Sequence, residues 1–304
     1  MKQYDLIIVG GGPGGYTAAL YGARAGLRTL ILEKMSAGGQ MGLTSQIENY
    51  PGFPEGVDGI ELADRMQLQA ERNGAETMYA EVTSLQLQGD VKLVKTTEAD
   101  VEAKTVVIAT GANPRTLGLE KEQMLTGKGV HYCAHCDGMF YRGKTVAVVG
   151  GGNSAVADAL HLSRLAEKVY LIHRRDRLRA ERIQEQALRE AENIEILWNT
   201  TVEKLLENGR LNGVVLRDAR NGAKRELALD GLFVSVGRVP VTELVKGQLE
   251  LDGAGYIVAD ETTQTSIPGV FAVGDVRTKA LRQVVTAVSD GAVAVHFADA
   301  YLHE

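Results

Sequence analysis

The stretch LIIVGGGPGG, residues 6–15, decides the fold. A short apolar run, Leu6 to Val9, leads into a cluster of glycines, and an alanine-rich segment from Tyr16 to Ala25 follows and closes with Gly26. The apolar, β-branched run is typical of a buried parallel strand. The alanine-rich segment predicts a helix that ends at the glycine. With a second predicted strand at residues 29–32, the stretch opens a β-turn-α-β unit.

The glycines of this turn have the spacing Gly10-x-Gly12-x-x-Gly15. The first allows a tight bend, the second lets a pyrophosphate approach the main chain, and the third lets helix and strand pack closely. The helix N-terminus then offers amide donors to the phosphates. Glu33 ends the next strand, 23 residues after Gly10, where a carboxylate accepts hydrogen bonds from ribose hydroxyls. The alternatives are a plain tight turn and a solvated charge at the strand end.

The same pattern returns 140 positions further along the chain. Residues 145–149 predict a strand, Gly150 to Ala155 a glycine turn, Val156 to about Ala166 a helix, and Val169 to Ile172 the next strand. Gly150 and Gly152 take the first two glycine positions, and Ala155 takes the third small position. The chain therefore contains an internal duplication of one dinucleotide-binding unit.

Basic residues follow the second unit where the first has its acid. His173 lies 23 residues after Gly150, Arg174 and Arg175 come next, and Arg179 is near. Guanidinium groups offer planar forks of donors that suit a 2′-phosphate. The second dinucleotide is therefore predicted to be NADPH rather than NADH. A solvated basic turn is the alternative, and His173 could simply pack at the strand end.

Two dinucleotide sites in one chain predict two cofactors, FAD and the nicotinamide that reduces it. Thr110-Gly111 and Gly274-Asp275 each follow an apolar run and look like further turns near a flavin, although either could be an ordinary strand-end turn. Residues 270–275 predict a strand and its turn, and Gln283 to Ala300 a closing helix, which together return the chain to the first unit.

We therefore expect an α/β protein with two Rossmann-like, three-layer domains, one inserted into the other. Residues 1–113 and 241–304 are expected to form a discontinuous FAD-binding domain, and residues 114–240 an NADPH-binding domain with the cysteine motif. The crossings are predicted near Asn113-Pro114 and Arg238 to Pro240, because proline discourages helix continuation.

Cys133 and Cys136 are the only cysteines of the chain. With two residues between them, one sulfur can attack an external disulfide while the other returns to resolve the mixed disulfide. Asp137 follows directly and is well placed in sequence to move protons, provided that burial raises its pKa. A metal site is the alternative, since His131 and His135 lie beside the cysteines, but six consecutive residues can hardly wrap a tetrahedron. We expect no metal; a packed structural dithiol also stays open.

Composition limits the other functions. The net charge of −6 argues weakly against nucleic acid as a partner. No apolar run reaches the roughly 18 residues of a membrane helix, so no membrane span is expected. The apolar run at residues 6–9 is too short for a signal-peptide core. A cytoplasmic protein is the resulting prediction, in keeping with a lone pair of closely spaced cysteines.

Together these motifs resemble the low-molecular-weight, bacterial type of thioredoxin reductase among the pyridine nucleotide-disulfide oxidoreductases. The similarity runs along essentially the whole chain. It lies in residues 10–19, 38–40, 48–52, 133–141, 150–160, 173–180, 231–237, 263–275 and 282–283.

The resemblance implies a homodimer that passes electrons from NADPH through FAD to a cysteine pair and on to thioredoxin. It implies that Cys136 sits against the flavin, that Cys133 attacks the thioredoxin disulfide, and that Asp137 is the proton-transfer acid. The cofactor-binding residues that we predict from the motifs and the resemblance are Gly10, Gly12, Pro13, Gly15, Glu33, Gly38, Gly39, Gln40, Asn49, Thr110, Gly111, Gly274, Asp275, Arg282, Gln283, Val284, Gly150, Gly152, Asn153, Ser154, His173, Arg174, Arg175 and Arg179.

Rival functions keep the same core. A flavoprotein reductase could serve a different small dithiol protein or a peroxiredoxin-type partner. A dithiol oxidase that uses oxygen would not need the arginines at 174 and 175, and a ferredoxin-NADPH reductase would lack the cysteines. A redox-sensing interaction protein would not need two intact dinucleotide sites.

Overall fold

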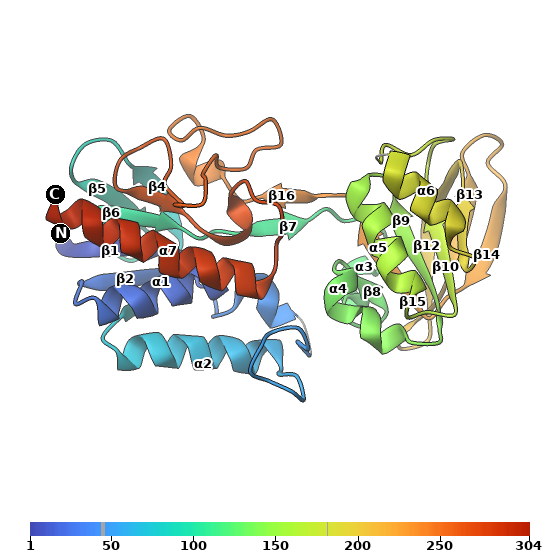
Figure 1. Ribbon diagram of the computed structural model, residues 1–304, viewed down its shortest axis with the longest axis horizontal. Coiled ribbons are helices and arrows are strands. Elements are labelled where there is room, and N and C mark those ends of the chain that lie inside the picture. Colours follow the sequence, from blue (N-terminus) through green and yellow to red (C-terminus); the bar gives the residue numbers. More distant parts are fainter. Residues whose placement is uncertain (44–45, 181) are drawn as a thin grey trace. The chain divides into compact units, whose positions relative to one another are not determined.

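The computed structural model describes residues 1–43, 46–180 and 182–304. The chain divides into two units, one of residues 1–113 and 239–304 and the other of residues 114–238 (Figure 1). The first crossing falls at Asn113-Pro114, and the second lies two residues before the predicted boundary at Pro240. The predicted α/β class with two Rossmann-like units is confirmed.

The first unit is built on a seven-stranded sheet. Its strands are β1 (Lys2–Val9), β2 (Thr29–Glu33), β3 (Glu76–Tyr79), β4 (Val82–Gln86), β5 (Lys92–Thr96), β6 (Val101–Ile108) and β17 (Val270–Ala272). Their order is β3-β2-β1-β6-β5-β4, and β17 also pairs with β6. Val9 is in register with Leu32 and Ile108, and Ile108 with Ala272. The carboxyl ends of these four parallel strands therefore lie along one edge of the sheet.

Alternate residues of β1 pack into two separate layers. Leu6 and Ile8 belong to the hydrophobic cluster under the helices, together with Phe271 and Val295. Ile7 and Val9 belong to the cluster on the opposite face, which residues 245–276 help to cover. The described residues of this unit form the helices α1 (Pro13–Arg24), α2 (Gly59–Arg72) and α7 (Val284–His303). They also form the short 3₁₀ turns η1 (Gly39–Leu43), η3 (Glu243–Val245) and η4 (Gly274–Val276).

The second unit repeats the arrangement on a five-stranded sheet in the order β11-β10-β9-β15-β8. Its strands, all parallel to their neighbours, are β8 (Val130–His131), β9 (Thr145–Gly150), β10 (Lys168–Ile172), β11 (Ile194–Leu197) and β15 (Gly231–Ser235). Helices α5 (Asn153–Ser163) and α6 (Arg182–Glu190) accompany it, as do α3 (Glu122–Leu125), α4 (Ala134–Asp137) and η2 (Gly138–Tyr141). An antiparallel sheet of β12 (Thr200–Glu207), β13 (Leu211–Asp218) and β14 (Lys224–Ala228) completes the unit.

Alternation along β9 again separates two cores. Val146 and Val148 pack with Val156 and Leu162 of α5. Ala147 and Val149 pack with residues of the antiparallel sheet, such as Leu205, Val214 and Leu216. Both units therefore have three layers, and the predicted duplication is present as β1-α1-β2 and β9-α5-β10.

Several predicted boundaries moved by a few residues. Helix α1 begins at Pro13 rather than Tyr16, and α5 begins at Asn153 rather than Val156. In both cases the helix starts directly at the glycine turn, and proline suits the first helical position because its missing N–H has no intrahelical partner there.

The two segments that cross between the units pair as β7 (Ala112–Pro114) and β16 (Arg238–Pro240). In the described part of the chain, every helix is too short or too polar to cross a membrane.

One buried ion cluster ties α7 to the turn after β17. The Asp290 carboxylate accepts two hydrogen bonds from Arg277, at 3.0 and 2.8 Å, and one from the Lys279 Nζ at 2.7 Å. It also accepts the Gly274 amide at 2.8 Å. Asp290 is only 6% exposed and Arg277 only 5%. Burial by itself would raise the pKa of Asp290, but the hydrogen bonds from Arg277 and Lys279 outweigh it and hold the pKa below its usual value.

We predict that Asp290→Asn lowers the free energy of unfolding by about 3–5 kcal/mol, because two buried cations lose their counter-charge. Urea unfolding at neutral pH measures the loss. Asp299→Asn, on a half-exposed carboxylate of the same helix, is the control and changes stability by less than about 0.5 kcal/mol. Since the folded-state pKa of Asp290 is depressed, its contribution is present above about pH 4 and is lost as pH falls through the folded value. If Asp290→Asn and Asp299→Asn were equally stable, the buried ion cluster around Asp290 would not contribute as predicted.

Candidate functional site

The first glycine turn separates glycines that the fold needs from one that it does not. A Cβ atom on Gly10, whose φ is +108°, would lie 2.5 Å from the Ala109 oxygen. A Cβ atom on Gly15 would lie 2.0 Å from the Gly10 oxygen. Gly12 has an ordinary φ of −79°, and a Cβ atom there would meet nothing within 4 Å. Space is therefore left open beside Gly12, at the N-terminus of α1, as a dinucleotide pyrophosphate requires.

Residues far apart in sequence surround this turn. The Glu33 carboxylate accepts the Gly11 amide at 2.7 Å and the Met35 amide at 3.1 Å. Gly38 donates its amide to the Gly11 oxygen at 2.8 Å. A Cβ atom on Gly39 would lie 3.8 Å from the Gly12 Cα. The carboxylate and the 38–39 segment are thus held beside the turn at which they were predicted to act.

The other predicted residues of this unit are joined by hydrogen bonds. Gln40 Nε2 donates to Asn113 Oδ1 at 3.1 Å, and Asn49 Nδ2 donates to Gln283 Oε1 at 3.0 Å. The Thr110 hydroxyl donates to the Val241 oxygen at 2.5 Å, and the Gly111 oxygen accepts the Val241 amide at 3.0 Å.

The start of α7 completes the set. Gln283 is its N-cap, in a reciprocal capping box with Thr286, and Val284 is its first residue. Arg282 reaches the Asp275 oxygen at 3.4 Å and lies over the Tyr256 ring at 4.1 Å. Gly274, at the turn after β17, is fixed by Asp290. Asp290 was not among the predicted residues, because only the fold brings it to this turn.

In the second glycine turn, too, one glycine is required by close packing and another borders open space. A Cβ atom on Gly150 would lie 2.4 Å from both the Ser235 oxygen and the Ala155 Cβ. Gly152, with φ −101°, again has nothing within 4 Å of a Cβ position. Asn153 and Ser154 follow as exposed residues at the start of α5. This turn too leaves room for a phosphate at a helix N-terminus.

The arginine loop is folded back onto this turn. His173, 5% exposed, places Nδ1 at 2.8 Å from the Gly150 oxygen and Nε2 at 2.9 Å from the Arg177 oxygen. The Arg179 amide donates to the Gly151 oxygen at 2.7 Å. Both ring nitrogens of His173 are thus occupied in holding the loop. The side chains of Arg174, Arg175 and Arg179 are exposed, and none forms an ion pair with a described carboxylate, so they are available to an anion.

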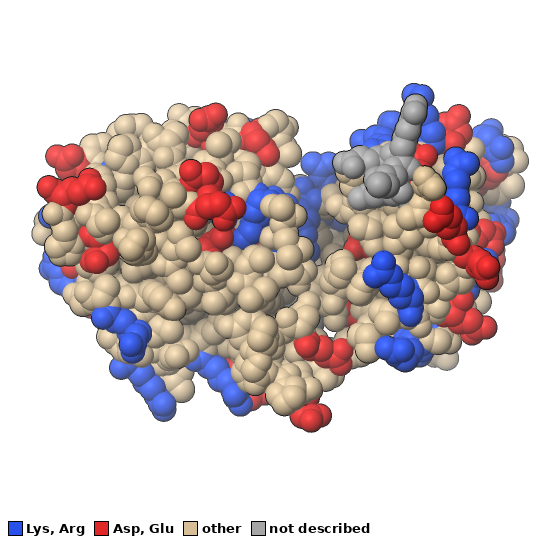
Figure 2. All heavy atoms as spheres, in the orientation of Figure 1, with Lys and Arg blue, Asp and Glu red and all other residues tan. Residues whose placement is uncertain are grey.

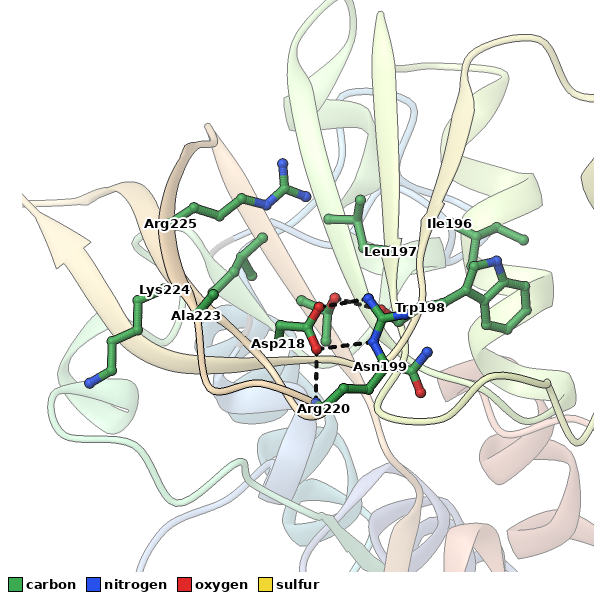
Figure 3. Close-up of a pocket in the computed structure, with 11 residues that line it drawn as sticks. Ile196, Leu197, Trp198, Asn199, Asp218, Arg220, Ala223, Lys224 and Arg225 are labelled. Carbon is green, nitrogen blue, oxygen red and sulfur yellow. Dashed lines mark hydrogen bonds and ion pairs between the residues drawn. The ribbon is translucent and has the colours of Figure 1, made fainter.

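An open pocket of about 480 Å³ lies in the same unit (Figure 3). Figure 3 shows Asp218 and Arg220 paired within it, at 2.8 Å, and this pair lowers the pKa of Asp218 to about 2. The Asn199 amide, at its edge, donates to the Arg175 oxygen at 3.1 Å. None of the predicted site residues lines this pocket, which is formed by Ile196, Leu197, Trp198, Asn199, Thr200, Leu216, Asp218, Arg220, Ala223, Lys224 and Arg225.

Cys133 and Cys136 form a disulfide, with their Cα atoms 5.3 Å apart. Cys133 is the N-cap of the short helix α4, and the Cys136 amide donates to the Cys133 Sγ at 3.2 Å. Both residues are partly exposed. Among residues 1–43, 46–180 and 182–304, no group of three or more His, Cys, Asp or Glu side chains is arranged to hold a metal ion.

One residue beside the cysteines has a place that the sequence did not reveal. His131 was weighed only as a metal ligand. In the structure its Nδ1 lies 3.0 Å from Asp137 Oδ2, and its Nε2 lies 2.7 Å from the Tyr141 hydroxyl. His135, by contrast, is exposed, with its ring 4.1 Å from that of His161. His131 lies two residues before Cys133, and its position in the sequence alone could not predict that it would contact Asp137 and Tyr141.

The chain is similar to known proteins over nearly its whole length. Residues 4–291 match the family model for pyridine nucleotide-disulphide oxidoreductases. The thioredoxin reductase of Peptoclostridium acidaminophilum is 43% identical, over 98% of this chain and 97% of the relative, and that of Treponema pallidum is 45% identical, over 99% and 97%. The crystal structure of thioredoxin reductase from Streptococcus pyogenes, 44% identical, aligns with a TM-score of 0.93 over 99% of this chain and 98% of its own.

We predict that Gly12→Ala and Gly152→Ala fold normally, at a cost of less than about 1 kcal/mol, but bind dinucleotide about tenfold more weakly, a loss of ~1.4 kcal/mol. The added methyl group enters the space left at each helix N-terminus. Flavin content after purification reports on Gly12→Ala, and NADPH titration reports on Gly152→Ala.

Gly15→Ala and Gly150→Ala are the matched controls, because their methyl groups would strike the main chain. They should lower the free energy of unfolding by about 1–3 kcal/mol or more. If all four variants lose stability alike, the open space beside Gly12 and Gly152 is not a binding site.

Proposed function

The chain belongs to the pyridine nucleotide-disulphide oxidoreductase family, and from that premise we propose that it is an NADPH-dependent thioredoxin reductase. One observation carries the proposal. A Cys-x-x-Cys disulfide occurs in a chain with two glycine turns that each open a helix. The strand after the first turn ends at Glu33, whereas the strand after the second is followed by the exposed arginines 174, 175 and 179. Similarity to thioredoxin reductases over 98–99% of the chain supports the same activity.

We assign FAD to the first unit and NADPH to the second. The Gly10–Gly15 turn and the α1 N-terminus would hold the FAD pyrophosphate, and Glu33 its ribose, after releasing the Gly11 amide that it now accepts. The 38–40 segment, Asn49, the Thr110 and Gly274 turns and the start of α7 complete the proposed site.

In the second unit, the Gly150–Ala155 turn would hold the NADPH pyrophosphate, and Arg174, Arg175 and Arg179 its 2′-phosphate. His173 supports their loop from behind, through its two carbonyl contacts. When bound, NADPH supplies a hydride and FAD carries its two electrons to the disulfide.

The cysteine pair performs the exchange with the substrate. The Cys133 thiolate bonds to one sulfur of the thioredoxin disulfide, and the other sulfur leaves. Cys136 then bonds to Cys133 and releases the second substrate sulfur. Asp137, the next residue on the same helical turn, supplies and recovers protons. Over one cycle NADPH, one proton and a disulfide give NADP⁺ and a dithiol, so atoms and electrons balance.

The setting follows from the same chemistry. An enzyme that produces dithiols suits a compartment in which thiols are kept reduced, so we place it in the cytoplasm. We propose that it is a homodimer, as the family resemblance implies. On the face of the molecule that Figure 2 shows, basic and acidic side chains are interspersed among uncharged ones over both units.

We predict that the double variant Arg174→Ala, Arg175→Ala raises the KM for NADPH at least about 100-fold and leaves the KM for NADH nearly unchanged. Each lost charge-assisted contact to the 2′-phosphate is worth about 1.5–3 kcal/mol, and NADH lacks that phosphate. Steady-state kinetics with both nucleotides measure the ratio. Arg189→Ala, which removes another exposed arginine of this unit, serves as the control and should leave the ratio alone.

The proposed function predicts the outcome of an anaerobic titration. NADPH should bleach the flavin absorbance of the purified protein, and oxidised thioredoxin should restore it. Cys133→Ser should still be reduced by NADPH but not reoxidised by thioredoxin, because the attacking sulfur is gone.

Two other outcomes have separate meanings. If a peroxiredoxin or another small dithiol protein restores the absorbance while thioredoxin does not, the partner assignment is wrong and the cofactor assignment holds. If NADPH does not bleach the flavin, the assignment of the arginine loop is wrong.

A further inference from the structure

A buried chain of three side chains starts at the residue after the cysteine motif. Asp137, 13% exposed in its side chain, meets His131 Nδ1 at 3.0 Å, and His131 Nε2 meets the Tyr141 hydroxyl at 2.7 Å. His131 is 6% exposed and Tyr141 is 2% exposed. The imidazole stacks on Phe233, with ring centroids 5.3 Å apart, and meets the Tyr141 ring edge-on. The imidazole and the phenol are thus shielded from water, and His131 joins Asp137 to Tyr141 through its two ring nitrogens.

Elements of the fold hold this chain in place at both ends. His131 is in β8, in register with Phe233 of β15. Asp137 and Tyr141 lie on the two successive short helices α4 and η2, so their side chains converge on one imidazole. A Cβ atom on Gly231 would lie 2.5 Å from the Tyr141 ring. Glycine is needed at that position so that the tyrosine can reach the histidine.

The far end of the chain meets a solvated group. Burial raises the pKa of Tyr141, and the guanidinium of Arg210 opposes that rise through charge and a hydrogen bond. Arg210 is exposed. The Tyr141 hydroxyl thus lies between a buried imidazole and a side chain in contact with water, which is where a proton would enter or leave.

The chemistry of the three groups permits two proton arrangements over the same heavy atoms. An ionised Asp137 accepts from Nδ1–H, and Nε2 then accepts from the tyrosine hydroxyl. A protonated Asp137 donates to Nδ1, and Nε2–H then donates to the tyrosine oxygen. The second arrangement holds one proton more, on Asp137, and carries the imidazole proton on Nε2 instead of Nδ1; the rings need not move.

We propose that His131 is a positioning residue through which Asp137 exchanges protons with Tyr141, and from there with solvent, while the cysteine pair reduces a disulfide. This role rests on the proposed function. As the substrate S–S bond breaks, its two electrons remain on the departing sulfur, and Asp137 gives that sulfur a proton. The proton leaves from Asp137 Oδ1, while Oδ2 accepts Nδ1–H from His131. Nδ1–H then passes its proton to Oδ2, Nε2 takes the hydroxyl proton of Tyr141, and the tyrosine oxygen regains a proton from water, which leaves the three groups in the second arrangement.

The test compares two disulfides whose leaving thiols differ in their need for a proton. The leaving thiol of bis(2-hydroxyethyl) disulfide is basic and must be protonated as it departs. The aromatic thiolate of 5,5′-dithiobis(2-nitrobenzoate) departs without a proton, because its parent thiol is acidic. Each is mixed anaerobically with the NADPH-reduced holoenzyme, and the rate of enzyme oxidation is measured by stopped-flow absorbance.

We predict that His131→Gln lowers the rate with the hydroxyethyl disulfide at least tenfold and the rate with the aromatic disulfide by less than twofold. General acid catalysis contributes about 10²–10⁴ in such steps. Tyr141→Phe should lower the ratio of the hydroxyethyl rate to the aromatic rate by a smaller factor than His131→Gln. The double variant should lower that ratio no further than His131→Gln alone. His303→Gln removes an exposed His–Asp pair with a nitrogen–oxygen distance of 3.5 Å, and this control should leave both rates unchanged.

Each outcome bears on the proposal. If His131→Gln slows both disulfides equally, His131 only supports the site and the proton role is overturned; unchanged rates overturn it as well. If His131→Gln does not fold, Tyr141→Phe decides by the same ratio. Neither disulfide is thioredoxin, so a wild-type enzyme that fails to reduce thioredoxin counts against the proposed function and leaves the ratio measurable.

Discussion

The close approach of helix and strand at each glycine turn is the constraint on which the rest of the structure depends. At Gly15 a single methyl group would strike the Gly10 oxygen, and at Gly150 it would strike both Ala155 and the Ser235 main chain. Because the main chains touch there, the first turn of α1 or α5 lies directly above the carboxyl end of its strand. The open space beside Gly12 or Gly152 then lies at the start of the helix. The proposed phosphate site is thus a consequence of how helix and strand pack.

Parallel strand pairing brings several such turns to one edge of the first unit's sheet. Since Val9, Ile108 and Ala272 share a register, the turns that follow them meet at one edge although they are separated by about 100–260 residues of chain. The buried Asp290 cluster then fixes the last of these turns to α7. A buried ion cluster adds little net stability compared with apolar packing. In this arrangement one carboxylate satisfies both cations and the Gly274 amide, so the turn and the helix are joined at a single residue.

The sequence predicted what local patterns encode. Both β-turn-α-β units, the register of Glu33 and His173 and the cysteine pair follow from spacing along the chain. The buried partners could not be found in this way, because Asp290 and His131 acquire their roles from contacts made through the fold. The predicted helix starts were three residues too late for a similar reason. Helix propensity places the starts at Tyr16 and Val156, whereas the fold starts α1 and α5 directly after the glycine turns, at Pro13 and Asn153.

The redox motif and the cofactor turns are built in opposite ways. Each glycine turn opens a helix of eleven or twelve residues whose packing fixes the turn. The cysteines instead cap α4, which has four residues and few internal hydrogen bonds to position them. A short helix cannot by itself hold an acid such as Asp137 in a fixed orientation. The side chain of Asp137 instead meets the buried imidazole of His131, so the proposed proton transfer depends on a residue of the neighbouring strand β8.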